Sequence, residues 1–150
     1  CWVPLLHLYP EAQVPVVQVS LPAHAGPAEV YALGQALAPL RAQGILLVGS
    51  GGMTHNLLEL RREDGPTEPY VRDFCGWVER TLMRGDLATL LAYRAQAPQA
   101  ERAHPSDEHF LPLYFALGAA GWGQPHGPLP RYITREVMYR SLSMDAFSLH

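Results

Sequence analysis

His55 lies where this sequence is best suited to place a reactive side chain. It follows a β-branched, apolar segment (residues 45–48) and a glycine-rich turn (residues 49–52). Open α/β sheets gather ligands at the carboxyl ends of their strands, and a glycine-rich turn lets backbone N–H groups approach an anion closely. Neither the G-x-G-x-x-G spacing of dinucleotide-binding proteins nor a phosphate-loop Gly-Lys-Ser/Thr is present. His55 is therefore a candidate functional residue. The alternative is an ordinary strand-to-helix turn capped by Thr54 or Asn56.

His109 is the second candidate, within the segment His-Pro-Ser-Asp-Glu-His-Phe at residues 104–110. Ser106 is a good N-cap, and a helix over residues 106–120 places His109 in its first turn, where the helix dipole disfavours imidazolium. A neutral imidazole is what a metal ligand or a general base requires. Glu108, one residue away, should point to another side of the helix and not share a metal with His109. The alternative is a polar helix start without chemistry.

The remaining reactive residue types carry weaker signals. Position alone assigns no role to the other histidines, His7, His24, His104, His126 and His150. Cys1 and Cys75 have no partner at metal-ligand spacing, and Cys75 is expected to be a buried, reduced thiol in a helix. Ser50 does not lie in a G-x-S-x-G elbow, and Asp64 is expected to be a solvated loop charge.

The elements that would position these residues follow an α/β pattern. Residues 13–20 and 45–48 each have the continuous apolar character of a strand buried on both faces. Between them, residues 27–41 show apolar spacings of three and four after Pro27, which is typical of an amphipathic helix. This order predicts two parallel strands joined by a right-handed crossover. Further helices are predicted over residues 69–84, 86–94 and 106–120, and partial strand alternation over 131–140. The predicted fold is a three-layer α/β type, with a central, mostly parallel sheet flanked by helices.

Composition narrows the class of protein. The chain has 150 residues, 48% hydrophobic and 17% charged, with a formal charge of −3. These values suit one globular domain and exclude a disordered chain. The sequence contains no run of ~18 apolar residues, so no membrane span is predicted. The mild negative charge does not favour binding to the phosphates of nucleic acid. No basic region precedes an apolar core at the start, so the expected location is cytoplasmic. The apolar opening at Cys1 suggests that the chain begins inside a larger domain.

Several segments together resemble the class III extradiol ring-cleavage dioxygenases, specifically the 4,5-DOPA extradiol dioxygenase subgroup. In chain order, the matching segments are Tyr-Pro-Glu-Ala (9–12), Val-Pro-Val-Val-Gln-Val-Ser (14–20), Gly-Ile-Leu-Leu-Val-Gly-Ser-Gly (44–51), Thr-His-Asn-Leu (54–57), His-Pro-Ser-Asp-Glu-His-Phe-Leu-Pro-Leu (104–113), Ala-Leu-Gly-Ala (116–119) and Ser-Leu-Ser-Met-Asp-Ala-Phe (141–147). The resemblance covers nearly the whole chain.

This resemblance implies a single α/β domain with a non-haem metal, Fe(II) or Zn(II). It implies that His109 is a metal ligand and that His55 is the catalytic acid/base beside the metal, counted as a ligand in some members. His104 matches a position that varies among members and receives no role. The expected partners are a catechol, DOPA-like in this subgroup, and O₂. His55 would take a catechol proton and later return one, which requires a pKa near neutral.

The sequence also departs from the family pattern. The His-Gly-Ser-Pro and Ser-Ala-His segments, which supply two further histidines to the family's metal site, do not occur here. We therefore expect residues 1–150 to be the carboxyl-terminal part of a larger extradiol dioxygenase-like domain with an incomplete metal site. The missing amino-terminal segment, or a homo-oligomer, would be its partner. The alternatives are a catalytically inactive member that binds a metal or a partner, and a metal-assisted hydrolase with an activated water.

Overall fold

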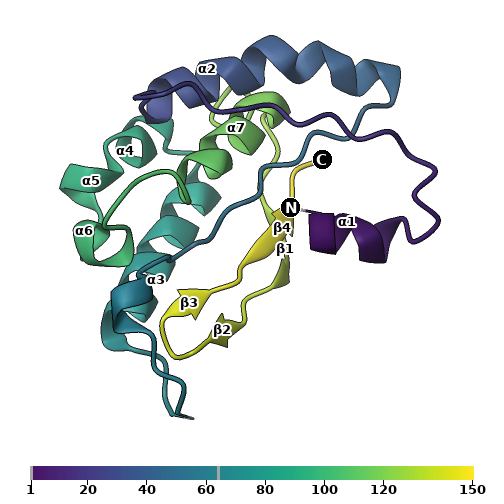
Figure 1. The fold of residues 1–150 in the computed structure, drawn as a ribbon. Helices are drawn as coiled ribbons and strands as arrows, with labels where there is room; N and C mark the ends of the chain where they lie inside the picture. Colours follow the sequence, from purple (N-terminus) through teal and green to yellow (C-terminus); the bar gives the residue numbers. More distant parts are fainter. Residues whose placement is uncertain (1, 64) are drawn as a thin grey trace.

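The protein is mainly helical, with two small sheets at one side (Figure 1). The computed structural model describes residues 2–63 and 65–150, so the predictions for Cys1 and Asp64 lie outside the described residues. The helices are α1 (Trp2–Leu8), α2 (Pro27–Leu37), α3 (Pro69–Arg84), α4 (Leu87–Leu91), α5 (Tyr93–Gln96), α6 (Ala100–Ala103) and α7 (Leu111–Ala120), with 3-10 turns η1 (Ala38–Gln43) and η2 (Leu57–Glu59). Among these described helices, none combines the length and the apolar character needed to cross a membrane.

Helix α3 is the central element of the core and matches its predicted range. Pro69 occupies its first turn, where the missing N–H costs nothing, and Gly85 ends it with a left-handed φ of 65°. One face carries Val71, Phe74 and Val78, each at most 1% exposed. Burying side chains of this size stabilises a fold by about 1.5–3 kcal/mol each.

Helices α2 and α7 lie side by side above α3 (Figure 1), and one tryptophan connects all three. Tyr31 on α2 donates its hydroxyl hydrogen to the Trp122 carbonyl at 2.5 Å. The Trp122 indole N–H donates to the Leu82 carbonyl on α3 at 3.0 Å. Trp122 is fully buried and follows the left-handed end of α7 at Gly121. The predicted helix over residues 27–41 is confirmed as α2 continued by η1.

Both sheets are antiparallel and formed by the last part of the chain. Strand β1 (Arg131–Thr134) pairs with β4 (Ala146–Ser148), with an irregularity between Tyr132 and Thr134. Strand β2 (Val137–Met138) pairs with β3 (Leu142–Ser143). The strand alternation predicted in residues 131–140 is thus confirmed in part.

The structure corrects the prediction of two parallel strands. Residues 13–20 and 45–48 form no strand among the described residues. Their apolar side chains are largely exposed: Val17 is 84% exposed and Leu46 is 65% exposed. A strand exists only when a neighbouring strand accepts and donates its backbone hydrogen bonds, and the described chain places none beside these segments. The pattern indicated β-propensity, which does not itself supply a pairing partner, and the central parallel sheet is not confirmed.

The helix predicted from Ser106 begins later, at Leu111. Residues 105–110 form turns instead, in which the Phe110 and Leu111 N–H groups donate to the Asp107 carbonyl at 2.8 and 3.0 Å. Pro112 then lies in the first turn of α7, where a proline is favourable. His109 therefore precedes the helix, and the dipole argument for its first turn does not apply.

Candidate active site

The structure brings His55 and His109 together. Their imidazole rings stack with centroids 3.5 Å apart and planes inclined by 21°. Both side chains are half-buried, and the His109 side chain is 43% exposed. Two residues separated by more than fifty positions in the sequence thus form one imidazole pair, here called the histidine pair.

The glycine-rich turn makes this approach feasible. A Cβ atom on Gly51 would lie 2.2 Å from the His109 carbonyl oxygen, and one on Gly49 would lie 2.2 Å from that of Pro112. Side-chain Cβ atoms do not tolerate such distances, so only glycine fits at both positions. The next N–H, that of Gly52, donates to the His109 carbonyl at 2.8 Å. These glycines allow close contact with the chain's own backbone, whereas their pattern in the sequence indicated close contact with a ligand or an anion.

The loop that carries His55 is held by hydrogen bonds on both sides. The His55 N–H donates to the Ala103 carbonyl at 2.9 Å, and the Asn56 amide donates to the Arg102 carbonyl at 2.7 Å. On the opposite side, the Thr54 hydroxyl donates to the Ser141 carbonyl at 2.8 Å. Asn56 also accepts from the Leu58 N–H at 3.1 Å and caps η2, as the alternative of a capped turn expected of Thr54 or Asn56. The position of His55 is therefore defined by backbone from two other parts of the chain.

Burial and the neighbouring imidazole favour a neutral His55. Burial, and then the neighbouring imidazole of His109, lower the pKa of His55, while the Glu108 carboxylate acts in the opposite direction. Glu108 Oε1 lies 3.9 Å from His109 Nε2 and accepts from the Ser106 hydroxyl at 2.8 Å. The prediction that Glu108 points away from His109 is thus wrong, because this segment is a turn and not a helix. A neutral imidazole accepts a proton, so His55 is suited to act as a base.

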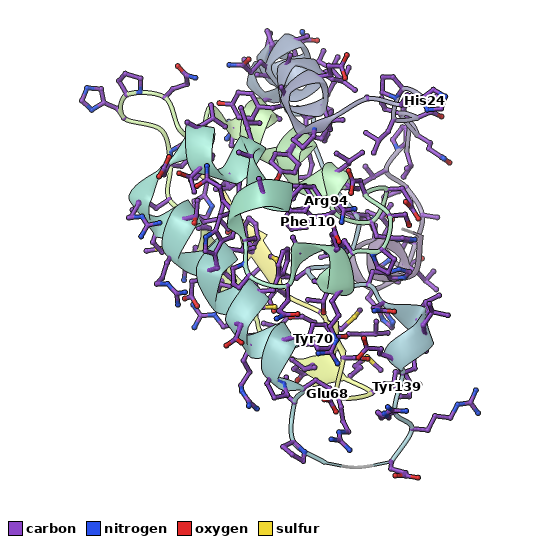
Figure 2. The ribbon with its side chains drawn as sticks, turned by 90° about the vertical axis from the view of Figure 1, so that its left-hand side faces the viewer. His24, Glu68, Tyr70, Arg94, Phe110 and Tyr139 are labelled. Carbon is purple, nitrogen blue, oxygen red and sulfur yellow. The ribbon has the colours of Figure 1, made fainter. Side chains whose placement is uncertain are left out.

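Arg94 stabilises the turn that leads to His109, and no sequence motif predicted this role. Arg94, on α5, donates to the His104 carbonyl at 2.5 Å and forms an ion pair with the Asp107 carboxylate. The Tyr93 hydroxyl donates to the same carboxylate at 2.6 Å. Figure 2 labels Arg94 together with Phe110, the residue after His109. In the sequence, the only sign of this contact is that Asp107 follows the Tyr93-Arg94 pair by about fourteen residues.

The histidine pair matches a metal in ligand type but not in number. Imidazole is a suitable ligand for both iron and zinc. A catalytic metal of this kind takes three protein ligands and keeps a position open. The described part of the chain contains no group of three or more His, Cys, Asp or Glu side chains that could hold a metal ion. Cys75 is a free thiol inside α3, as predicted, although it is half-buried where a buried thiol was expected. Burial raises its pKa to about 12, so it is not a ready thiolate ligand.

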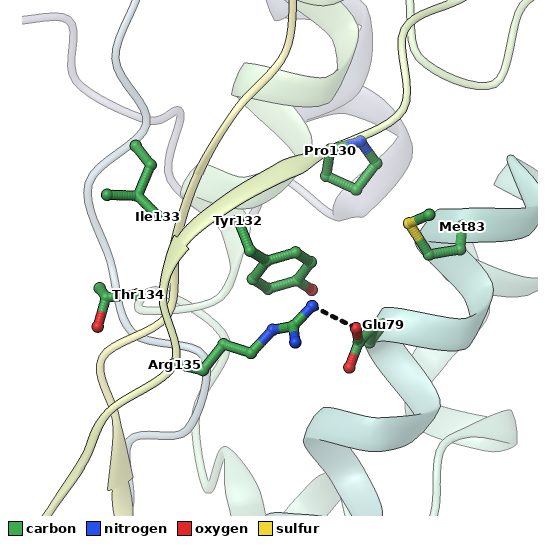
Figure 3. Close-up of a pocket in the computed structure, with 7 residues that line it drawn as sticks. All are labelled: Glu79, Met83, Pro130, Tyr132, Ile133, Thr134 and Arg135. Atoms are coloured by element: carbon green, nitrogen blue, oxygen red, sulfur yellow. Dashed lines mark hydrogen bonds and ion pairs between the residues drawn. The ribbon is translucent and has the colours of Figure 1, made fainter.

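One surface hollow is lined by residues other than the histidine pair. It encloses about 540 Å³ between α3 and β1 and is open to solvent. The Arg135 guanidinium donates to the Glu79 carboxylate across it at 2.5 Å, and Figure 3 shows the Tyr132 ring beside this guanidinium. The hollow contacts neither His55 nor His109, so its size carries no argument about their chemistry.

The comparisons with known proteins identify the family of the chain. Residues 1–141 match the family model described as the catalytic LigB subunit of aromatic ring-opening dioxygenase. The chain belongs to this family. The resemblance to class III extradiol dioxygenases is thereby confirmed, and the aligned segment includes His55 and His109.

Curated proteins and a solved structure are similar to this chain over most of its length. A 4,5-DOPA dioxygenase extradiol of Beta vulgaris is 42% identical over 120 residues, which cover 80% of this chain and 45% of that protein. One of Escherichia coli K12 is 31% identical over 131 residues, covering 83% and 47%. A crystal structure of an uncharacterized protein from Escherichia coli K12 shares 32% identity and a TM-score of 0.83, covering 97% of this chain and 59% of that one. The chain spans about half the length of the curated relatives it matches.

Proposed function

We propose that this chain provides the His55–His109 part of the active site of a non-haem, metal-dependent extradiol dioxygenase that opens a catechol ring with O₂. The observation that carries the proposal is the stacking of the two imidazoles at 3.5 Å. Membership of a family of aromatic ring-opening dioxygenases supports it, and the relatives named 4,5-DOPA dioxygenase extradiol favour a DOPA-like catechol as the substrate.

The proposal assigns different roles to the two histidines. His109 serves as a ligand of Fe(II) or Zn(II), and His55 serves as the acid/base and as a further ligand. The lowered pKa of His55 keeps it neutral near neutral pH, so that it can accept a proton from a catechol hydroxyl. A complete site requires at least one more protein ligand than the described residues provide. We propose that residues 1–150 are the carboxyl-terminal part of one such domain; the cytoplasmic location and a homo-oligomer stay predictions.

The test uses the full polypeptide that contains this chain, loaded with Fe(II), and L-DOPA or a simple catechol. We expect oxygen consumption together with the yellow ring-opened product. His55→Gln should lower kcat by about 10²- to 10⁴-fold, the usual contribution of a general acid/base. The matched control is His126→Gln, because His126 is exposed in the loop after α7 and has no role in the proposed mechanism.

Each contrary result identifies an alternative. Metal binding without oxygen consumption by the full polypeptide would indicate a catalytically inactive member of the family. Hydrolysis of a substrate other than a catechol, in the absence of O₂, would indicate a metal-assisted hydrolase. Equal activity of His55→Gln and His126→Gln would remove His55 from the mechanism.

A further inference from the structure

His104 is a buried histidine for which the mechanism above has no use. Its side chain is fully buried, between aromatic rings of the core. The ring centroid lies 4.8 Å from that of Phe110 and 5.6 Å from that of Phe74. Phe110 directly follows His109, so the ring of His104 is fixed against the residue next to one member of the histidine pair.

One edge of the His104 ring contacts the loop of the other member. Nε2 of His104 lies 2.9 Å from the Met53 carbonyl oxygen, two residues before His55. A carbonyl oxygen only accepts, so Nε2 carries the hydrogen and Nδ1 does not. Within the described residues Nδ1 has no hydrogen-bond partner. Burial lowers the pKa of His104 to about 4, so the ring is neutral and keeps one tautomer at ordinary pH.

This side chain adds a different kind of connection to those already described. The Gly52 and His55 N–H groups donate to carbonyls of His109 and Ala103, which are backbone contacts that other residue types at those positions could retain. The contact from His104 instead depends on a side-chain donor of one particular length. The His104 ring packs against Phe110 and its Nε2 bonds to the loop of His55, so one side chain links the two segments.

We propose that His104 is a positioning residue, which fixes His55 against His109 by donating from Nε2 to the Met53 carbonyl. The expected effect of His104 on the reaction rate rests on the proposed ring-opening function. Its effect on the position of His55 does not. Without the donor, the Met53 carbonyl stays buried and unpaired, and the loop has to move to reach another donor. His55 moves with it, and the stacking with His109 is lost.

The first experiment needs no substitution. Imidazole nitrogen shifts in the NMR spectrum of the wild-type protein distinguish the two tautomers, and we expect His104 to be neutral with hydrogen on Nε2. Hydrogen on Nδ1 would overturn the proposal, because Nε2 then could not donate to Met53.

The second experiment compares His104→Leu with His104→Gln. Glutamine places an N–H donor at a reach similar to that of Nε2, and leucine fills the space without a donor. In His104→Leu, we expect the ring protons of His55 and His109 to lose the upfield shift that stacked rings cause, with helical circular dichroism retained. His104→Gln should keep that shift. If leucine prevents folding, His104→Met carries the same comparison.

The third readout is the activity of the full polypeptide. We expect kcat to fall about 10- to 100-fold in His104→Leu, with KM changed little and His104→Gln restoring most of the rate, because small misplacements of a reacting group cost rates of this order. Unchanged His55 and His109 resonances in His104→Leu, or equal losses in both variants, would overturn the proposal. If the wild-type protein opens no catechol while the NMR results hold, the proposed function fails and the positioning by His104 stands.

Discussion

Replacing Gly51 by alanine tests whether the glycine-rich turn creates the histidine pair. The new Cβ would lie 2.2 Å from the His109 carbonyl oxygen, whereas contacts under 3.0 Å are essentially never seen. The turn must therefore move away by at least the 0.8 Å between these values. The adjacent Gly52 N–H bond to the same carbonyl, 2.8 Å long, would be stretched or lost.

The expected loss of stability follows from these two effects. Overpacking costs about 1–3 kcal/mol, and a lost hydrogen bond costs about 1 kcal/mol. The smaller entropy of the unfolded alanine variant offsets about 0.4–1 kcal/mol. We expect the free energy of unfolding to fall by about 2–3 kcal/mol, which at a typical urea m value of about 2 kcal/mol/M lowers the midpoint by about 1–1.5 M.

Urea unfolding followed by circular dichroism measures this change, and NMR of the imidazole protons reports the separation of His55 from His109. The matched control is Gly52→Ala, in the same turn, where the nearest atom to a new Cβ is 3.3 Å away and a shift of a few tenths of an ångström suffices. It should lose less than about 1 kcal/mol. A Gly51→Ala variant as stable as Gly52→Ala, with the imidazole resonances unmoved, would refute the close packing of this turn on His109.

Three further predictions follow from the same contacts. Because the pKa of buried His104 falls from 6.5 to about 4, the unfolded chain binds a proton first on acidification. Stability should therefore fall by about 2–3 kcal/mol between those pH values, and this loss should be smaller in His104→Gln in acid-titrated urea unfolding. Asp107→Asn removes the ion pair with Arg94 and should weaken the His109 turn, seen as faster amide exchange there. Asn56→Ala loses a bond to Arg102 and the cap of η2, and should cost about 1–2 kcal/mol by thermal unfolding.

The helices were largely predictable because their signals are local. The positions of α3 follow from Pro69, the apolar spacing from Val71 to Leu82 and Gly85, all within about one helix length. The same kind of local reasoning failed for residues 106–110. Ser106 was a plausible N-cap, but its hydroxyl bonds to Glu108 and the backbone turns at Asp107 instead. Whether a cap residue starts a helix depends on competing partners that the capping pattern does not include.

The two predicted strands failed for a non-local reason. Val17 and Leu46 have the side chains that a buried strand requires, but strand formation depends on backbone partners from elsewhere. Described residues offer such partners only for β1 to β4. β-propensity therefore indicates that these segments can adopt an extended conformation, but it does not identify a strand with which they pair.

The sequence by itself determined the family resemblance, the main helices and the two histidines to consider. Those conclusions rest on residue identity, order and local spacing, all of which are available from the sequence without a structure. Only the tertiary structure decided that His55 stacks on His109, that Gly51 packs against the His109 backbone, and that His104 reaches the Met53 carbonyl. Each of these contacts joins segments roughly fifty residues apart, and their distances are set by packing and hydrogen bonding between elements, which no local pattern encodes.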